Sequence, residues 1–206
     1  MQPDHRSIPL WKRTFDILVS LLGLLCLWPL FIIIALFIKL DSQGPVFFRQ
    51  ERIGQGFRPF RICKFRTMVA DASSRGSIIT AGHDPRITRI GRILRQTKLD
   101  ELPQLINVLR GEMSLVGPRP EVRHYVELFR SDYEDVLAVR PGITDLASLK
   151  YRDEEAALGR SRDPEYEYRC HVLPDKIALA REYARRSSFL FDLALIAKTF
   201  KRVFFG

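Results

Sequence analysis

Residues 17–38 read ILVSLLGLLCLWPLFIIIALFI, a run of 22 residues without a charged side chain. A membrane-spanning helix needs about 20 consecutive apolar residues, so this run predicts a membrane-embedded helix. Pro29 lies near the middle of the run, where it removes one backbone donor and clashes with the preceding turn. We therefore expect the helix to kink or break at this residue.

Basic residues flank the apolar run on both sides. Lys12 and Arg13 precede it, and Lys39 begins a basic stretch after it. Basic flanks prefer the cytoplasmic side of a membrane, whereas a simple span would place one set outside. The parts before and after Pro29 would rise about 18 Å and 14 Å, each short of a hydrocarbon layer of about 30 Å. We expect a re-entrant helix–break–helix hairpin over residues 1–40, with a bitopic helix that tolerates its proline as the alternative.

The overall composition narrows the class of protein. The chain has 206 residues, a formal net charge of +9, and 25 Arg against 8 Lys. Arg forms planar bidentate bonds to phosphate, so the bias indicates anionic partners, with a GC-rich genome as the other explanation. The three cysteines form no CxxC pair and the four histidines no HExxH pattern, which argues against a disulfide framework and a zinc hydrolase. The remainder, residues 41–206, is long enough for one cytoplasmic, membrane-associated catalytic domain.

The C-terminal stretch SSFLFDLALIAKTFKRVFFG, residues 187–206, predicts an amphipathic helix. Its apolar stripe consists of Leu193, Ala197, Phe200 and Phe204. Asp192 falls on another face, and lysines flank the stripe, so the helix suits the headgroup region of a membrane. An ordinary helix packed on the protein core is the alternative. Together with a β-hairpin predicted within residues 46–68 around Gly54-Gln55-Gly56, this gives an α+β fold that is mainly helical.

Residues 84–98, DPRITRIGRILRQTK, predict a helix with Asp84 as N-cap and Pro85 at its first position. Its basic row consists of Arg86, Arg89, Arg92 and Arg95. Such a row could bind nucleic acid nonspecifically, a membrane surface or a diphosphate substrate. A solvated basic face of the helix is the simplest alternative.

Residues 99–110, LDELPQLINVLR, predict a second short helix that ends at Gly111. Asp100 and Glu101 stand at its start, where the helix dipole and the basic residues upstream favour the ionised carboxylates. Two such neighbours can simply cap the helix. They can also do chemistry, since one carboxylate can attack phosphorus while the other helps to hold Mg²⁺. Nearby arginines would then offset charge on the phosphoryl group in transfer.

Two arginines further along the chain, Arg119 and Arg140, lie next to prolines that restrict the backbone. Pro118 and Pro120 fix the chain on both sides of Arg119, which suits precise contact with a phosphate. Arg140 precedes a Pro-Gly turn and repeats the arrangement. A plain loop with turn prolines is the alternative in both places.

These features together resemble the bacterial sugar transferase family, the monotopic phosphoglycosyl transferases. The matching stretches are KFRTM at 64–68, DPRIT at 84–88, LDELPQLINVLRGEMSLVGPRP at 99–120, RPGIT at 140–144 and FDLALIAKTF at 191–200. The N-terminal apolar segment with its internal proline also fits. The match follows the family's order over nearly the whole chain, and its long central motif is highly specific.

The resemblance implies transfer of a sugar 1-phosphate from a UDP-sugar to polyprenyl (undecaprenyl) phosphate, with release of UMP, as the first membrane step of bacterial polysaccharide assembly. It implies Asp100 as the nucleophile that carries the phosphosugar, Glu101 as a Mg²⁺ ligand, and Pro29 as the hairpin break. Phosphate contacts are implied for Arg95, Arg119, Lys64, Arg66 and Arg140.

The same resemblance implies partners and a location. The partners are the UDP-sugar, polyprenyl phosphate and membrane lipids, without nucleic acid, and a homo-oligomer is compatible with the sequence. The site would lie at the cytoplasmic face of the bacterial inner membrane, with the carboxylate of Asp100 bare and negative at the edge of the bilayer.

The sequence departs from the family pattern at two points. Trp28 precedes Pro29 where many relatives have Ser, and residues 145–148 read DLAS where many have GLAQ. The second departure and the charged stretch 150–163 leave the sugar unspecified. Two alternatives stay open: Asp100 as a general base for direct attack by the lipid phosphate, and a non-catalytic basic protein bound to a membrane surface or nucleic acid.

Overall fold

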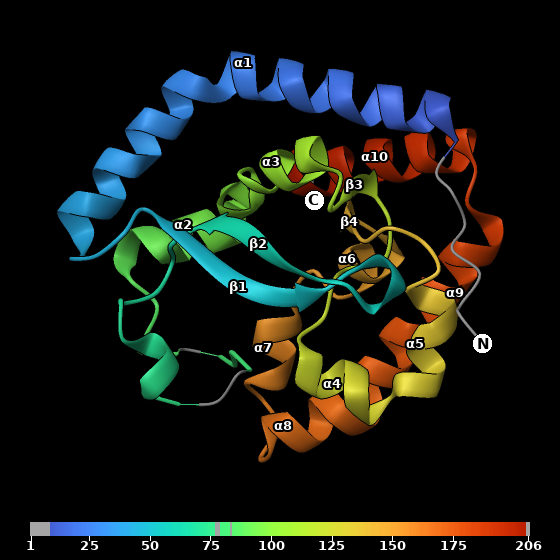
Figure 1. Cartoon of the computed structure of the whole chain (residues 1–206). Helices are drawn as coiled ribbons and strands as arrows, with labels where there is room; N and C mark the ends of the chain where they lie inside the picture. Colours follow the sequence, from blue (N-terminus) through green and yellow to red (C-terminus); the bar gives the residue numbers. More distant parts are fainter. Residues whose placement is uncertain (1–8, 77–78, 83, 205–206) are drawn as a thin grey trace.

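The computed structural model describes residues 9–76, 79–82 and 84–204 and is mainly helical, with two small sheets (Figure 1). The helices are α1 (Leu10–Asp41), α2 (Arg89–Thr97), α3 (Gln104–Arg110), α4 (Arg123–Leu128), α5 (Arg130–Val136), α6 (Leu146–Lys150), α7 (Glu154–Leu158), α8 (Pro164–Glu167), α9 (Leu173–Arg186) and α10 (Phe189–Phe204). The strands are β1 (Phe47–Ile53), β2 (Pro59–Phe65), β3 (Ser114–Val116) and β4 (Gly142–Thr144). The predicted mainly helical α+β class is confirmed.

Helix α1 arches over the rest of the molecule and bends in its middle (Figure 1). Pro29 lies inside this helix of 32 residues. We expected two helices separated by a break, whereas the structure has one helix that continues through the proline. A proline removes only one intrahelical hydrogen bond, so a bend is enough to relieve the clash of its ring with the preceding turn.

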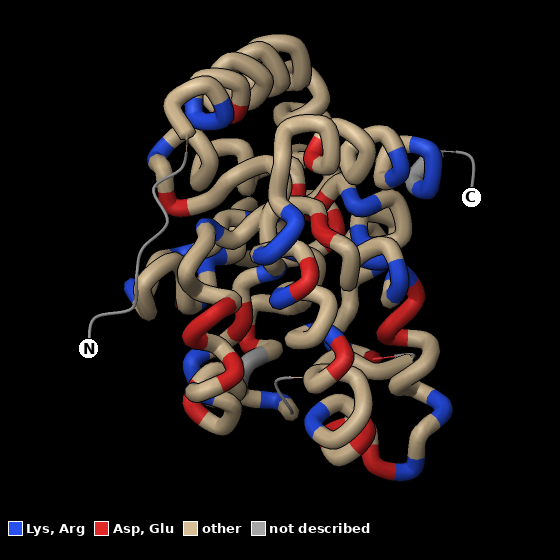
Figure 2. The backbone as a smooth tube through the Cα atoms, turned by 90° about the vertical axis from the view of Figure 1, so that its right-hand side faces the viewer, with Lys and Arg blue, Asp and Glu red and all other residues tan. Residues whose placement is uncertain are grey.

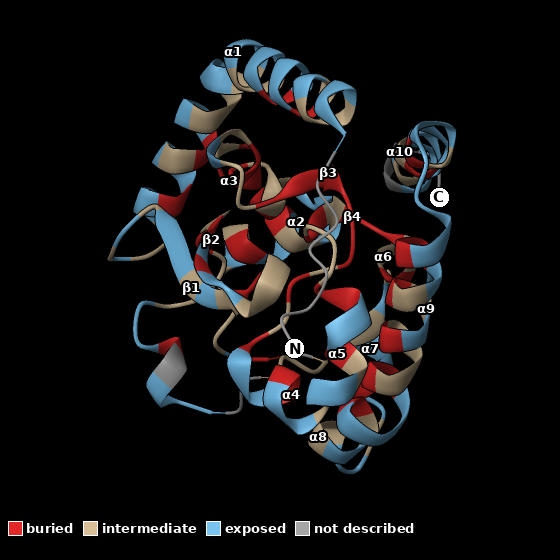
Figure 3. Cartoon of the chain, turned by 45° about the vertical axis from the view of Figure 1, so that its right-hand side comes forward, coloured by how far each residue is buried: buried red, intermediate tan, exposed pale blue. Residues whose placement is uncertain are grey.

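The outer face of α1 is apolar and exposed (Figure 3). Its exposed side chains include Leu18, Leu22, Leu25, Trp28, Ile32 and Leu36. Most of the arch carries no charge, and the charged residues gather in the body beneath it (Figure 2). Within the described residues, α1 is the one helix long and apolar enough to cross a membrane. A continuous exposed apolar surface marks a site of contact with a membrane or with another protein.

Both ends of α1 are bonded to the same body of the protein. Near its start, Arg13 donates a hydrogen bond from Nη1 to the backbone oxygen of Val108 in α3, at 2.6 Å. At its end, the carboxylate of Asp41 accepts a hydrogen bond of 2.9 Å from the backbone N–H of Ile90 in α2. The two arms of the bent helix therefore reach back to neighbouring helices of one body.

Strands β1 and β2 form the predicted antiparallel hairpin. Their register pairs Phe47 with Phe65 and Ile53 with Pro59. The turn between them has left-handed backbone at Gly56, with φ of 67°. Inward-facing residues of β2 pack on α1 and α3, so this strand lies beneath the bent helix α1.

Strands β3 and β4 form a short parallel pair that the sequence did not predict. Ser114 pairs with Gly142, and Val116 pairs with Thr144. The backbones approach so closely that a Cβ atom on Gly142 would lie 2.0 Å from the nitrogen of Gly117. Only glycine fits at this crossing. It places the two proline-stiffened motifs, at 117–120 and 140–142, side by side.

The start of α2 differs from the prediction. Asp84 does not cap a helix, because its carboxylate is held by Arg86, with Nε to Oδ1 at 2.9 Å. The helix begins instead after Thr88, whose hydroxyl accepts a hydrogen bond of 3.0 Å from the N–H of Gly91. The next predicted helix is also shorter, since α3 starts at Gln104, but it ends before Gly111 as expected.

The C-terminal helix α10 is amphipathic as predicted, but Asp192 lies on its buried side. Asp192 is buried together with Leu195, facing α1 and α9, because it pairs with Lys12. Leu193 and Phe200 of the predicted apolar stripe are exposed, so packing of this stripe on the core is wrong. The side chain of Phe204 lies outside the described residues. Leu193 and Phe200 therefore present apolar surface to the exterior.

Candidate active site

The two candidate carboxylates lie in a tight turn between α2 and α3. Lys98 ends α2 in the left-handed conformation, with φ of 58°, and so reverses the chain. A 3₁₀ turn, Leu99–Glu101, follows and carries Asp100 and Glu101. Pro103 then precedes α3. The left-handed residue and the proline together hold both carboxylates in the crossing between the two helices.

Glu101 is surrounded by cations that come from two different sheets. Lys64 of β2 donates from Nζ to Oε1 at 2.8 Å. Arg119, which follows β3, donates from Nη1 to Oε2 at 3.2 Å and from Nη2 to Oε1. Burial alone would raise the pKa of Glu101, but Arg119 and Lys64 hold this pKa well below its usual range. Glu101 is therefore ionised at neutral pH.

Asp100 is buried, with only 7% of its surface exposed, so the expected bare carboxylate is wrong. The charges of Lys64 and Arg95 act on this carboxylate. Burial raises the pKa of Asp100 to about 6, against the opposing charges of Lys64 and Arg95. Within the described residues its carboxylate has no hydrogen-bond or ion-pair partner. Asp100 is thus an unpaired carboxylate of raised basicity, next to Glu101, which is paired with two cations.

The backbone at Arg119 is held in place by the carboxylate of Asp145. Its backbone N–H donates to Oδ2 of Asp145 at 3.1 Å, while Oδ1 of Asp145 accepts from the N–H of Ser148 at 2.6 Å and caps α6. The pairing with Glu101 raises the pKa of Arg119 further above its usual value. Asp145 was not among the predicted site residues, although the sequence marks it as part of the unusual DLAS stretch.

Arg95 lies in the last turn of α2, close enough to Asp100 for its charge to lower the pKa of that carboxyl. Its Nε donates to Oε1 of Glu155 in α7 at 2.9 Å, and its Nη1 contacts the hydroxyl of Thr67 at 3.4 Å. The predicted basic row is therefore divided. Arg86 and Arg95 are paired with carboxylates, and Arg89 and Arg92 are exposed.

Arg66 is not brought to the carboxylates. Its buried guanidinium donates to the backbone oxygens of Gln43 at 2.6 Å and Ser42 at 2.7 Å. These bonds tie the end of α1 to β2. The KFRTM motif therefore supplies Lys64 to the candidate site and the Thr67 hydroxyl beside Arg95, while its Arg66 holds the end of α1.

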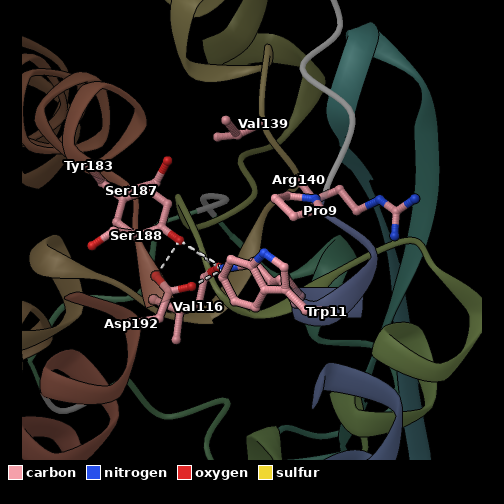
Figure 4. Close-up of a pocket in the computed structure, with 11 residues that line it drawn as sticks. Pro9, Trp11, Val116, Val139, Arg140, Tyr183, Ser187, Ser188 and Asp192 are labelled. Carbon is pink, nitrogen blue, oxygen red and sulfur yellow. Dashed lines mark hydrogen bonds and ion pairs between the residues drawn. The ribbon is translucent and has the colours of Figure 1, made fainter. Parts of the chain in front are cut away.

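Arg140 also lies elsewhere, at the rim of a cavity of about 210 Å³ near the start of α1 (Figure 4). On the other side of this cavity, Asp192 pairs with Lys12 and accepts a hydrogen bond of 2.8 Å from the hydroxyl of Tyr183. In Figure 4 the guanidinium of Arg140 points away from this polar cluster. The structure thus unites four of the predicted residues around Asp100 and places Arg66 and Arg140 apart.

Asp100 and Glu101 could hold a divalent cation only together with ligands that the described residues do not supply. No group of three or more metal-ligating side chains exists within the described part of the chain. Mg²⁺, however, is commonly held by one or two carboxylates together with substrate phosphates and water. Oε2 of Glu101 carries only the longer hydrogen bond of 3.2 Å, and each carboxylate oxygen has two lone pairs. Glu101 therefore retains one acceptor site, adjacent to the unpaired Asp100.

The chain is similar to known proteins along most of its length. Residues 7–206 match the bacterial sugar transferase family. The chain is 44% identical over 202 residues to an undecaprenyl-phosphate glucose phosphotransferase of Komagataeibacter xylinus, covering 95% of this chain and 36% of that protein. It is 38% identical over 194 residues to the UDP-glucose:undecaprenyl-phosphate glucose-1-phosphate transferase of Escherichia coli, covering 92% and 39%.

A shorter relative matches along most of both chains. The exopolysaccharide production protein ExoY of Sinorhizobium fredii is 35% identical over 207 residues, which cover 93% of this chain and 84% of that protein. By contrast, the chain spans little more than a third of the length of the two glucose phosphate transferases. The family match extends over nearly every residue and includes the turn that carries Asp100 and Glu101. The chain belongs to the bacterial sugar transferase family.

Proposed function

We propose that this protein transfers a sugar 1-phosphate from a UDP-sugar to polyprenyl phosphate through a covalent intermediate on Asp100. The observation that carries the proposal is the unpaired, buried carboxylate of Asp100 beside the Lys64–Glu101–Arg119 cluster. Relatives at 38–44% identity are named for transfer of glucose phosphate to undecaprenyl phosphate, which is the same class of reaction.

In the first step, an oxygen of Asp100 attacks the phosphorus that bears the sugar. The bond from this phosphorus to the bridging oxygen of the diphosphate breaks, and UMP leaves with that oxygen. In the second step, a phosphate oxygen of the lipid attacks the same phosphorus. The aspartyl–phosphorus bond breaks, which restores the carboxylate and gives a polyprenyl diphosphate sugar. Dividing the transfer in this way lets one site serve a soluble donor and a lipid acceptor in turn.

The surroundings of Asp100 suit this role. Burial raises the pKa of its carboxylate to about 6, so at neutral pH it is mostly ionised and more basic than an exposed aspartate. Lys64 and Arg119 are held by Glu101 at fixed positions close to it. Preorganised cations of this kind stabilise charge that develops on phosphoryl oxygens in the transition state.

Glu101 is the residue of this chain that would hold Mg²⁺, through the acceptor site left on its Oε2. When bound, the ion would neutralise charge on the diphosphate of the donor. Arg95 and Arg119 would contact the donor phosphates from two sides, since they reach the carboxylates from α2 and from the loop after β3.

The membrane arrangement proposed here is re-entrant, at the cytoplasmic face of the bacterial inner membrane. It is supported by the bonds that join both ends of α1 to α3 and α2 of one body. A straight helix of 32 residues would be about 48 Å long, enough to span a bilayer, but its two ends would then lie on opposite sides. The exposed apolar faces of α1 and α10 would lie at the membrane, where a lipid-anchored phosphate is found.

The reaction is tested by UMP release from a panel of UDP-sugars, with detergent-solubilised protein, Mg²⁺ and a polyprenyl phosphate. We expect turnover with at least one sugar, and its complete loss in Asp100→Asn. Asp135→Asn is the matched control, because Asp135 is an exposed aspartate of α5 that pairs with an arginine. Unimpaired turnover of Asp100→Asn would refute the assignment of Asp100 as the nucleophile.

A further inference from the structure

The carboxylate of Glu155 holds the guanidinium of Arg95. Nε of Arg95 donates to Oε1 of Glu155 at 2.9 Å, and Nη2 donates to the same oxygen. One edge of the planar guanidinium is therefore occupied, and Nη1 is turned toward the hydroxyl of Thr67, at 3.4 Å. The two residues are 60 positions apart in the sequence, so this contact depends on the tertiary fold.

Helix α7, which carries Glu155, is itself anchored on two sides. The backbone oxygen of Glu155 accepts a hydrogen bond of 2.8 Å from the N–H of Gly82. A Cβ atom on Gly159 would lie 2.5 Å from the Cα of Gly82, so the two backbones are in close contact. The neighbouring Glu154 forms an ion pair with Lys176 of α9. The helix that carries the Glu155 carboxylate is therefore held in place where this carboxylate contacts Arg95.

A partner that holds the arginine side chain in one conformation favours binding of a phosphate by that arginine. A free arginine side chain loses rotamer entropy when it is ordered by a ligand. Because Glu155 already orders Arg95 through one edge of the guanidinium, the remaining N–H groups keep a defined direction. The side chains of Arg95 and Glu155 are 21% and 41% exposed, so both are accessible from outside, and the charge of Arg95 acts on Asp100.

We propose that Glu155 is a positioning residue that presents Arg95 to the diphosphate of the nucleotide sugar. This inference rests on the proposed function, because it takes a nucleoside diphosphate as the ligand of Arg95. The charged stretch 150–163 of the sequence then acts on the donor through an arginine that lies outside it. Glu155 itself does not touch the reacting atoms.

A double-mutant cycle on ligand binding tests the proposal. The affinity of the full-length, detergent-solubilised protein for UDP is measured by titration calorimetry in wild type, Arg95→Ala, Glu155→Ala and the double variant. We expect Arg95→Ala to weaken binding about tenfold and Glu155→Ala about fivefold, with the double variant no weaker than Arg95→Ala alone. Glu155→Gln keeps an acceptor oxygen and should stay within about twofold of wild type.

Two results would overturn the inference. One is UDP binding by Glu155→Ala that equals or exceeds wild type, which would make Glu155 dispensable or a competitor for Arg95. The other is a further loss when Glu155→Ala is added to Arg95→Ala, which would mean that Glu155 acts independently of Arg95. Glu51→Ala is the control, since Glu51 pairs with Arg123 at 3.0 Å on the exposed side of the hairpin, and it should leave UDP affinity unchanged.

Failure of this inference is distinguishable from failure of the proposed function. An additive cycle with intact UMP release contradicts the role of Glu155 alone. Tight UDP binding with a non-additive cycle, but without UMP release from any UDP-sugar, contradicts the reaction and leaves the positioning role standing. Absence of UDP binding in wild type contradicts both.

Discussion

Asp100 and Glu101 are consecutive residues of one 3₁₀ turn, yet their carboxylates have opposite surroundings. Glu101 is bonded by Lys64 and Arg119, which keep its pKa well below the usual range. Burial raises the pKa of Asp100 to about 6, and within the described residues no side chain pairs with it. Environments that separate two neighbouring carboxylates in this way are typical of sites where each has a different role.

The raised pKa of Asp100 predicts the acid side of the pH profile. Below about pH 6 the carboxyl is protonated and cannot attack phosphorus, so kcat/KM for UMP release should fall about tenfold per pH unit. The charge of Lys98 lowers the pKa of Asp100. Lys98→Asn keeps a residue that tolerates the left-handed backbone there, and should shift the acid limb to higher pH. A flat profile down to pH 5 would contradict the assignment.

Removal of the Glu101 charge should affect both stability and activity. Glu101→Gln leaves the partly exposed cations Lys64 and Arg119 without their counter-charge, and losing hydrogen bonds to a charged group costs about 1.5–3 kcal/mol. Adding Lys64→Met removes one of these cations and should restore much of the stability without restoring UMP release. Urea unfolding and the release assay measure the two effects separately. Recovery of activity in the double variant would show that this cluster serves only the fold.

Arg66 should affect the stability of the protein, because it holds the end of α1, and not the catalytic reaction. Arg66→Ala removes hydrogen bonds from a charged group to the backbone oxygens of Ser42 and Gln43, at a cost of about 1.5–3 kcal/mol in stability. The folded protein should keep kcat/KM within a few-fold of wild type. Arg61→Ala, exposed on β2, the strand that ends just before Arg66, is the control for thermal unfolding. A normal melting temperature with a large loss of kcat/KM would return Arg66 to the active site.

The re-entrant arrangement predicts that both flanks of α1 are cytoplasmic. Single cysteines at positions 2 and 43 are introduced into a Cys26→Ser, Cys170→Ser background, in which Cys63 is buried. A membrane-impermeant maleimide added to intact cells should label neither position, and permeabilised cells should be labelled at both. Labelling of position 2 in intact cells would instead indicate a helix that spans the membrane.

Much of the fold follows from short-range sequence patterns. The long apolar run, the glycine-centred hairpin and the amphipathic C-terminal helix are each defined by neighbouring residues, and all three are confirmed as elements. The parallel pairing of β3 with β4 was missed, because strands of three residues show no period. The start of α2 was misplaced because Arg86 occupies the carboxylate that would have capped it.

The candidate site was predictable where one motif carries several of its residues. Asp100, Glu101 and Arg119 belong to one continuous stretch, and the fold adds Lys64 and Arg95 to it. Asp145 and Glu155 were missed, because their contacts with Arg119 and Arg95 cross 26 and 60 residues of chain. Arg66 shares a motif with Lys64, but its side chain leaves β2 toward the end of α1. The functional roles themselves stay predictions.

The covalent intermediate is the central claim, and mass spectrometry tests it most directly. The purified protein is incubated with a UDP-sugar that it turns over, without polyprenyl phosphate, then quenched and analysed intact and as peptides. The account predicts a mass increase of one sugar phosphate on the peptide containing Asp100, absent in Asp100→Asn and lost when polyprenyl phosphate is added. UMP formed only in the presence of the acceptor, with no modified protein, would contradict it and favour a general-base role for Asp100.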